Sequence, residues 1–151
     1  MIISFFGHSD FCEKNGDREK ILNILNNHVA DNVVEFYLGG YGNFDRFAHE
    51  CCVEFKNSHN SASIIFVTPY ITEKYQNNHL RFINNSFDYI IYPPIESTPL
   101  RFSIPKRNEW IIRESDLIIC HITHNFGGAF KAYRYALKKQ QKKIINLPNL
   151  E

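Results

Sequence analysis

The chain has 151 residues, of which 44% are hydrophobic and 15% aromatic, and its formal net charge is +1 at pH 7. This length and composition are typical of one folded domain over residues 1–151, and they exclude an intrinsically disordered chain. The balanced charge gives no sign of a nucleic-acid or membrane-binding surface, and no apolar stretch reaches the roughly 18 residues of a membrane span. We therefore expect a cytoplasmic protein without nucleic-acid or membrane partners.

Six short apolar segments are predicted to be β-strands. They are bounded by glycine, proline and polar turn residues, and they show little alternation, as strands buried on both faces do. In chain order they cover residues 2–6, 33–38, 63–68, 89–92, 116–121 and 143–147.

Helical patterns lie between these strands. Apolar residues recur every three or four positions over about residues 17–29, 44–55, 106–114 and 129–137. The polar residues 71–84 predict a solvent-facing helix or a helix and loop, and residues 96–105 predict a loop. This alternation predicts an α/β fold that is Rossmann-like, with a mainly parallel sheet and helices on both faces.

Four polar or glycine-rich segments follow predicted strands, at residues 7–10, 39–46, 68–70 and 123–128. In a parallel sheet such segments gather at the carboxyl edge, where ligands of open α/β sheets bind. We therefore expect them to form one binding site, which includes Gly7, His8, Thr68, Asn125, Gly127 and Gly128.

The segment at residues 39–46 is a glycine-rich turn that leads from a strand into a helix. Glycine permits positive φ and close approach of a ligand, and a helix start offers free N–H groups and a partial positive charge. We expect Gly39, Gly40, Tyr41, Gly42 and Asn43 to hold a phosphate or another anion. The alternative is a tight turn that only packs.

Side chains elsewhere add to this anion site. Arg107 is a candidate ligand because its guanidinium fork matches phosphate oxygens, and the alternative is an exposed helix arginine. Tyr41 and Phe126 are candidates to stack on a base, whereas Phe44 fits the apolar stripe of a helix.

Several histidines follow strand ends and raise the alternative of a zinc site with Asp10. His121 and His124 straddle a strand end instead of sharing a helix face, so we expect them and His8 to hydrogen bond to a ligand or to backbone. The four cysteines have no CxxC spacing and are interpreted as structural. We expect neither a metal nor a cofactor.

The turn Gly39-Gly40-Tyr41-Gly42-Asn43 resembles the PGGxGT turn of the LOG proteins, once described as lysine decarboxylases. More broadly, the chain resembles the SLOG superfamily of Rossmann-like domains, particularly its small stand-alone bacterial members. Residues 3–8, 107–119 and 127–136 resemble other parts of the same pattern. The resemblance implies a domain that binds nucleotides or nucleotide-derived ligands. Some relatives cleave the N-glycosidic bond of a nucleoside monophosphate, and others sense a nucleotide signal.

The chain departs from this family at the catalytic positions. The LOG turn continues to a catalytic glutamate where this chain has Arg46, whose charge suits a phosphate better than a cationic sugar centre. Related deoxyribosyltransferases carry a catalytic glutamate after the last glycine turn, but residues 130–132 hold no carboxylate. Asp45 and Glu109 are candidate replacements, and the catalytic residue stays open.

These patterns favour a protein that binds a nucleotide or a nucleotide-derived small molecule at the carboxyl edge of the sheet, as a sensor or ligand-binding protein. The enzyme alternative is a nucleoside-5′-monophosphate N-glycosidase that uses a displaced carboxylate. A third alternative is an interaction module whose glycine turns only pack. A homo-oligomer is compatible with each of these.

Overall fold

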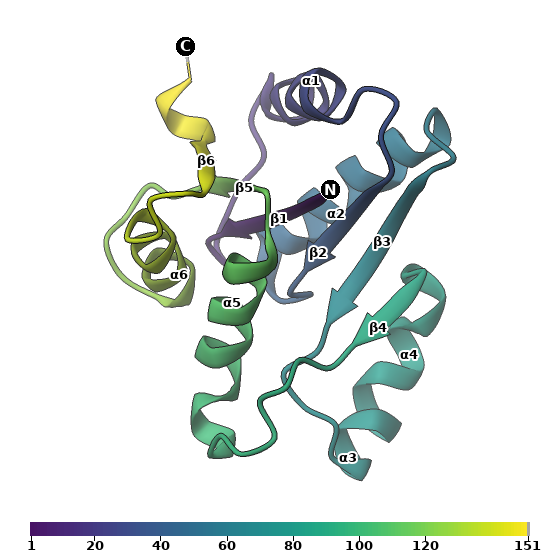
Figure 1. The fold of residues 1–151 in the computed structure, drawn as a ribbon, viewed down its shortest axis with the longest axis vertical. Coiled ribbons are helices and arrows are strands. Elements are labelled where there is room, and N and C mark those ends of the chain that lie inside the picture. The colour runs from purple at the N-terminus through teal and green to yellow at the C-terminus, as the bar shows by residue number, and fades with distance from the viewer. Residues whose placement is uncertain (151) are drawn as a thin grey trace.

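The computed structural model describes residues 1–150 and contains a six-stranded sheet with helices on both faces (Figure 1). The strands are β1 (Ile2–Gly7), β2 (Val34–Leu38), β3 (Ala62–Val67), β4 (Tyr89–Ile91), β5 (Leu117–His121) and β6 (Lys143–Asn146). Every pairing is parallel, in the order β4-β3-β2-β1-β5-β6. The predicted Rossmann-like α/β fold is confirmed.

The helices are α1 (Asp17–Val29), α2 (Gly42–Asn57), α3 (Glu73–Tyr75), α4 (Arg81–Ile83), α5 (Ser103–Glu114) and α6 (Gly128–Leu137). A π-helical turn, Gln76–Leu80, joins α3 to α4, and 3-10 turns cover Asn84–Ser86, Leu100–Phe102 and Leu147–Asn149. Helix α5 begins earlier than expected. Its first turn holds Pro105, which a first turn tolerates because the N–H that proline lacks would have no helical partner there. Within residues 1–150, no helix combines the length and apolar character required to cross a membrane.

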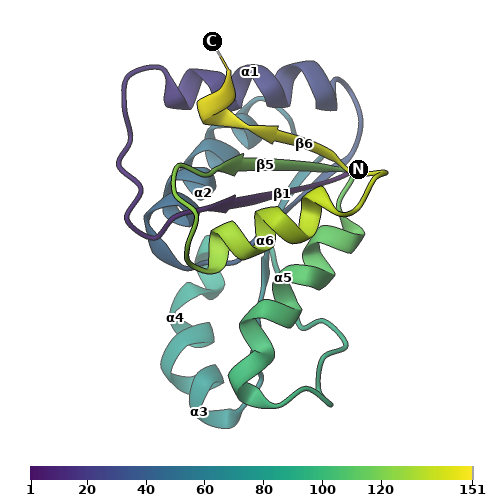
Figure 2. The same cartoon turned by 90° about the vertical axis from the view of Figure 1, so that its left-hand side faces the viewer.

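Both faces of the sheet are buried. On one face, Phe5 and Phe36 pack with residues of α1 and α2. On the other face, Phe6 and Tyr37 pack with residues of α5 and α6. Figure 2 shows this arrangement, with α6 in front of β1, β5 and β6 and with α1 and α2 behind them. Since successive strand residues point to opposite apolar layers, the strands show no alternation in the sequence.

The strand order reverses at β1, with β2 to β4 on one side and β5 and β6 on the other. Such a switch point leaves a crevice beyond the carboxyl ends of the strands. Gly7 ends β1 here, and a Cβ at this position would collide with the Phe44 side chain. Glycine therefore lets the start of α2 lie close against the end of β1.

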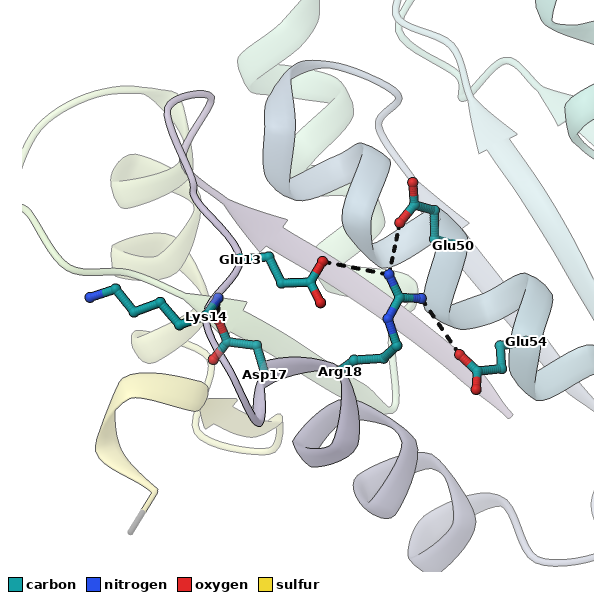
Figure 3. Close-up of polar contacts among 6 residues, drawn as sticks. All are labelled: Glu13, Lys14, Asp17, Arg18, Glu50 and Glu54. Atoms are coloured by element: carbon teal, nitrogen blue, oxygen red, sulfur yellow. Dashed lines mark hydrogen bonds and ion pairs between the residues drawn. The ribbon is translucent and has the colours of Figure 1, made fainter.

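The loop from His8 to Gly16 leaves this switch point and is fastened by ionic contacts (Figure 3). Arg18 Nη2 lies 2.9 Å from a carboxylate oxygen of Glu50 and 3.5 Å from one of Glu13, and its Nη1 lies 3.5 Å from Glu54. Asp17 accepts the backbone N–H of Lys14 at 2.8 Å. The loop is thereby tied to both α1 and α2, although each exposed pair contributes little energy alone.

Candidate functional site

A cavity of about 320 Å³ opens at the switch point, beyond the carboxyl ends of β1 and β2. Its volume lies at the lower end of the range for small-molecule sites. The lining comes from the end of β1, from the loops after β1, β2 and β5, and from the N-terminal parts of α2, α5 and α6. It comprises Phe5, Phe6, Gly7, His8, Ser9, Asp10, Gly39, Tyr41, Asp45, Ile104, Arg107, Asn108, His124, Phe126, Gly127, Gly128 and Ala129.

Arg107 brings a buried positive charge to this cavity. Only 3% of the residue is exposed. Its Nη1 donates to the carbonyl oxygens of Val67 at 2.7 Å and Gly39 at 3.2 Å, and its Nε donates to Asn108 Oδ1 at 2.9 Å. Burial lowers the pKa of Arg107, but a guanidinium stays charged at neutral pH. Within residues 1–150, Nη2 makes no hydrogen bond, so one side of the fork is left for a ligand.

The start of α6 forms another wall of the cavity. A Cβ added at Gly127 or Gly128 would meet no atom of residues 1–150 within 4 Å, and Gly127 has a φ of 90°. The absence of side chains thus leaves the backbone of this turn open. Free N–H groups and the positive end of the helix dipole make such a start suited to an anion.

The start of α2 is closed, in contrast to the expectation from the sequence. The N–H of Asn43 donates to the Ser9 carbonyl at 3.1 Å, and the N–H of Tyr41 donates to Asp45 Oδ2 at 2.8 Å. A Cβ at Gly42 would lie 2.7 Å from Ser9 Cα, and a Cβ at Gly40 would collide with the Phe66 ring. Gly40 and Gly42 therefore accommodate neighbouring parts of the protein, and the N–H groups of Tyr41 and Asn43 are already used within it.

Of the two candidate catalytic carboxylates, Asp45 and Glu109, the structure places only Asp45 in the cavity. Asp45 lines the cavity, and burial raises its pKa to about 7 against the opposing effects of the Tyr41 N–H and of Arg107. Glu109 does not line the cavity; its carboxylate lies 3.2 Å from Lys106 Nζ on the same helix. A carboxylate that is half protonated near neutral pH can both accept and donate hydrogen bonds.

Arg46 is exposed and faces a neighbouring groove, which it shares with Gly40, His49 and Phe87. The positive charge of Arg46 therefore lies outside the lining of the cavity and does not oppose a cationic sugar centre within it. Asp45 lies between the two and lines both the cavity and this groove, whereas Arg46 lines the groove alone.

Two histidines of the cavity are stacked and do not converge on a common point. The rings of His8 and His124 have centroids 3.4 Å apart, and Phe126 stacks on His124 at 3.8 Å. His8 Nε2 accepts the N–H groups of Thr123 and His124, so its proton resides on Nδ1. Burial and His124 lower the pKa of His8, which keeps the ring neutral.

His121 lies elsewhere, packed edge-on against Phe11 with centroids 4.8 Å apart. Over residues 1–150, no group of three or more His, Cys, Asp or Glu side chains is arranged to hold a metal ion.

Tyr41 joins the cavity to the segment around α3, which the sequence suggested only as a polar helix. Its hydroxyl hydrogen bonds to that of Tyr75, and its ring stacks on His79 at 5.8 Å. Arg107 lies 5.8 Å from the centroid of the same ring. Tyr75 and His79 are four positions apart, a spacing that places both on one helix face. Nothing in the sequence indicates that this face lies against Tyr41.

The structure thus brings together only part of the expected site. Seven of the expected ligand-binding residues line the cavity: Gly7, His8, Gly39, Tyr41, Arg107, Gly127 and Gly128. Six others do not line it: Gly40, Gly42, Asn43, Arg46, Thr68 and Asn125. Thr68 is buried and donates its hydroxyl to the Tyr70 carbonyl. Ile104 was not expected because α5 begins before the predicted helix. Asn108 lies within the predicted helix but was not among the expected ligand-binding residues.

Several solved structures have a similar fold. DNA processing protein A from Streptococcus pneumoniae has a TM-score of 0.61 and 20% identity over 94% of this chain and 48% of that one. Its counterpart from Helicobacter pylori has a TM-score of 0.60 and 19% identity over 93% of this chain and 62% of that one. The protein TM1055 has a TM-score of 0.59 and 13% identity over 98% and 74% of the two chains. At these identities the likeness shows the Rossmann-like fold.

This chain spans about half the length of the S. pneumoniae structure and less than two thirds of the H. pylori one. Searches with protein-family models and among curated proteins found no match.

One expectation from the sequence is wrong. Nucleic acid was excluded as a partner because the net charge is only +1. The H. pylori structure describes a single-stranded DNA binding mode of that protein. A protein with this fold therefore binds single-stranded DNA, and the exclusion of nucleic acid as a partner is withdrawn.

The pKa of Asp45 predicts a pH dependence of stability. Because this pKa is about 7 in the folded state and near 3.8 ordinarily, the folded state binds the proton more tightly. The contribution of Asp45 is fully present below about pH 4 and is lost as the pH rises through 7.

We expect Asp45→Asn to flatten the pH dependence of the free energy of unfolding between these values, measured by urea denaturation. Glu109→Gln is the control and should keep the parental slope. If the free energy of unfolding varies with pH in the same way in Asp45→Asn and in the parent, the raised pKa of Asp45 is contradicted.

Proposed function

We propose that this chain binds a nucleotide or a nucleotide-derived small molecule in the cavity at the carboxyl edge of the sheet. The phosphate lies between the guanidinium of Arg107 and the first turn of α6. The observation that carries this proposal is the buried Arg107 fork, whose Nη2 has no protein partner within residues 1–150 and which lines the same cavity as Gly127 and Gly128.

The electrostatics of the cavity favour an anion. A buried charge that is only partly hydrogen bonded loses much of its solvation, and a phosphate in the cavity would restore it with charge-assisted hydrogen bonds. The open N–H groups at the start of α6, which lines the same cavity, add a second set of donors. Asp45, with its pKa of about 7, is part protonated at neutral pH and suits a sugar hydroxyl.

A nucleotide unit presents the same phosphate, sugar and base when it is free and when it belongs to a single strand. The cavity of about 320 Å³ suits one such unit. The similar fold of the H. pylori protein, whose structure describes single-stranded DNA binding, supports including strands among the ligands.

The fold and the glycine-rich turn at residues 39–43 support membership in the SLOG superfamily. The four free cysteines support a reducing, cytoplasmic location.

The N-glycosidase alternative has one observation in its favour, which is the position of Asp45. Hydrolysis of an N-glycosidic bond forms an oxocarbenium-like sugar, which a carboxylate stabilises while the base departs and water adds. Asp10 is the other carboxylate in the lining, but its side chain is 75% exposed. Against the alternative, Arg107 places a fixed positive charge in the same cavity.

Replacing Arg107 should weaken ligand binding. We expect Arg107→Gln to bind adenosine 5′-monophosphate about 10- to 150-fold more weakly by calorimetry, because hydrogen bonds to charged groups are worth about 1.5–3 kcal/mol. Arg113→Gln is the matched control, since Arg113 lies on the same helix and donates to the Tyr135 hydroxyl outside the cavity.

Circular dichroism establishes that each variant is folded. If loss of the contacts to Val67 and Gly39 unfolds Arg107→Gln, then Gly128→Leu serves as the second variant. Its side chain fills part of the cavity from the start of α6, where a Cβ meets no atom of residues 1–150 within 4 Å. Parental affinity in a folded Arg107→Gln or Gly128→Leu variant would refute the site.

Incubation with nucleoside 5′-monophosphates should leave the N-glycosidic bond intact. Arg107 opposes a cationic sugar, and Asp45 is only part ionised at neutral pH. Chromatography of the incubated mixture measures free base directly. Release of base by the parent that disappears in Asp45→Asn, but persists in Glu109→Gln, would establish the enzyme alternative.

A further inference from the structure

Three rings form a continuous stack at the mouth of the cavity. His8 follows β1, and His124 and Phe126 follow β5. The His8 and His124 planes are inclined by 18°, with centroids 3.4 Å apart, and the His124 and Phe126 planes are inclined by 17°, with centroids 3.8 Å apart. Two loops that are far apart in sequence thus build one aromatic column.

The inner end of this column is fixed. His8 is 5% exposed, and its Nε2 accepts two backbone N–H groups, from Thr123 at 3.1 Å and from His124 at 3.3 Å. These bonds attach the loop after β5 to the ring of His8. The orientation of His124, and through it that of Phe126, therefore rests on the buried end of the stack.

The outer end of the column is bare. Phe126 is 65% exposed, although one face of its ring is covered by His124. An exposed phenyl ring held parallel to its neighbours presents a flat apolar surface, and nucleobases stack on such surfaces. The next two residues are Gly127 and Gly128, and all three line the cavity together with Arg107.

We propose that Phe126 is the stacking platform for the base, so that a bound nucleotide adds a fourth ring to the column of His8, His124 and Phe126. This inference rests on the proposed phosphate site and makes it more specific. The ligand is a nucleotide with an aromatic base, and a sugar phosphate without a base binds more weakly. Recognition of the base by stacking tolerates different bases, because each has a flat π-face.

Two ligands separate the platform from the phosphate site. Adenosine 5′-monophosphate carries both base and phosphate, whereas ribose 5-phosphate carries the phosphate alone. We expect calorimetry to show that Phe126→Ala weakens binding of the monophosphate about 5- to 150-fold, the range for loss of one stacked base. Binding of ribose 5-phosphate should be unchanged, and Phe126→Trp should keep the parental preference for the monophosphate.

Phe82→Ala is the matched control, because Phe82 is an exposed phenylalanine that does not line the cavity. Equal loss of both ligands in Phe126→Ala, or equal affinity of the parent for both ligands, would overturn the platform while leaving the phosphate site in place. Failure of both ligands to bind the parent protein would overturn the proposed function and the platform with it.

A further titration identifies the source of the nucleotide. Oligothymidylate with a 5′-phosphate presents the same unit at the end of a single strand. Tighter binding of the strand than of thymidine 5′-monophosphate, with both weakened by Phe126→Ala, supports the platform and assigns it to single strands. Tighter binding of the monophosphate, again weakened by Phe126→Ala, supports the platform and assigns it to free nucleotides. If Phe126→Ala binds both the strand and the monophosphate with the affinity of the parent, the stacking role of Phe126 is refuted.

Discussion

The buried charge of Arg107 is the constraint on which the carboxyl edge of the sheet depends. The carbonyl of Gly39, after β2, and that of Val67, at the end of β3, both accept hydrogen bonds from its Nη1. These bonds position the turn after β2 and place the ring of Tyr41 beside the guanidinium. A buried charge without sufficient partners is costly, so the remaining donors of this side chain favour an anion in the cavity.

The two glycine-rich turns at this edge have different roles because of their neighbours. The turn before α2 lies against the loop after β1, whose Ser9 carbonyl accepts the Asn43 N–H. Asp45 satisfies the Tyr41 N–H from within the same helix. At Gly127 and Gly128, where α6 begins, no atom in the part of the chain that the structure describes lies within 4 Å of the position that a Cβ would take. Two glycine-rich turns with similar sequences therefore differ in access. Contacts with neighbouring residues close the start of α2, and the start of α6 has no such contacts within residues 1–150.

The sequence was sufficient for the fold and for the edge of the sheet at which the cavity opens. Strand residues such as Phe5 and Phe6 are buried on opposite faces, and this produces apolar runs that indicate a parallel sheet. The sequence could not indicate which helix start is open, because the Ser9 carbonyl that accepts the Asn43 N–H at the start of α2 lies over 30 residues away in the chain. Nor could it place Tyr75 against Tyr41, a contact made by a segment with few apolar residues.

Backbone amide chemical shifts, recorded by NMR while adenosine 5′-monophosphate is added, test most directly where the phosphate binds. The largest changes are predicted at Gly127, Gly128 and Ala129, together with the Nε–H resonance of Arg107. Largest changes at Gly40, Gly42 and Asn43 would place the anion at α2 and contradict the site. No change at either helix start would contradict nucleotide binding at this edge of the sheet.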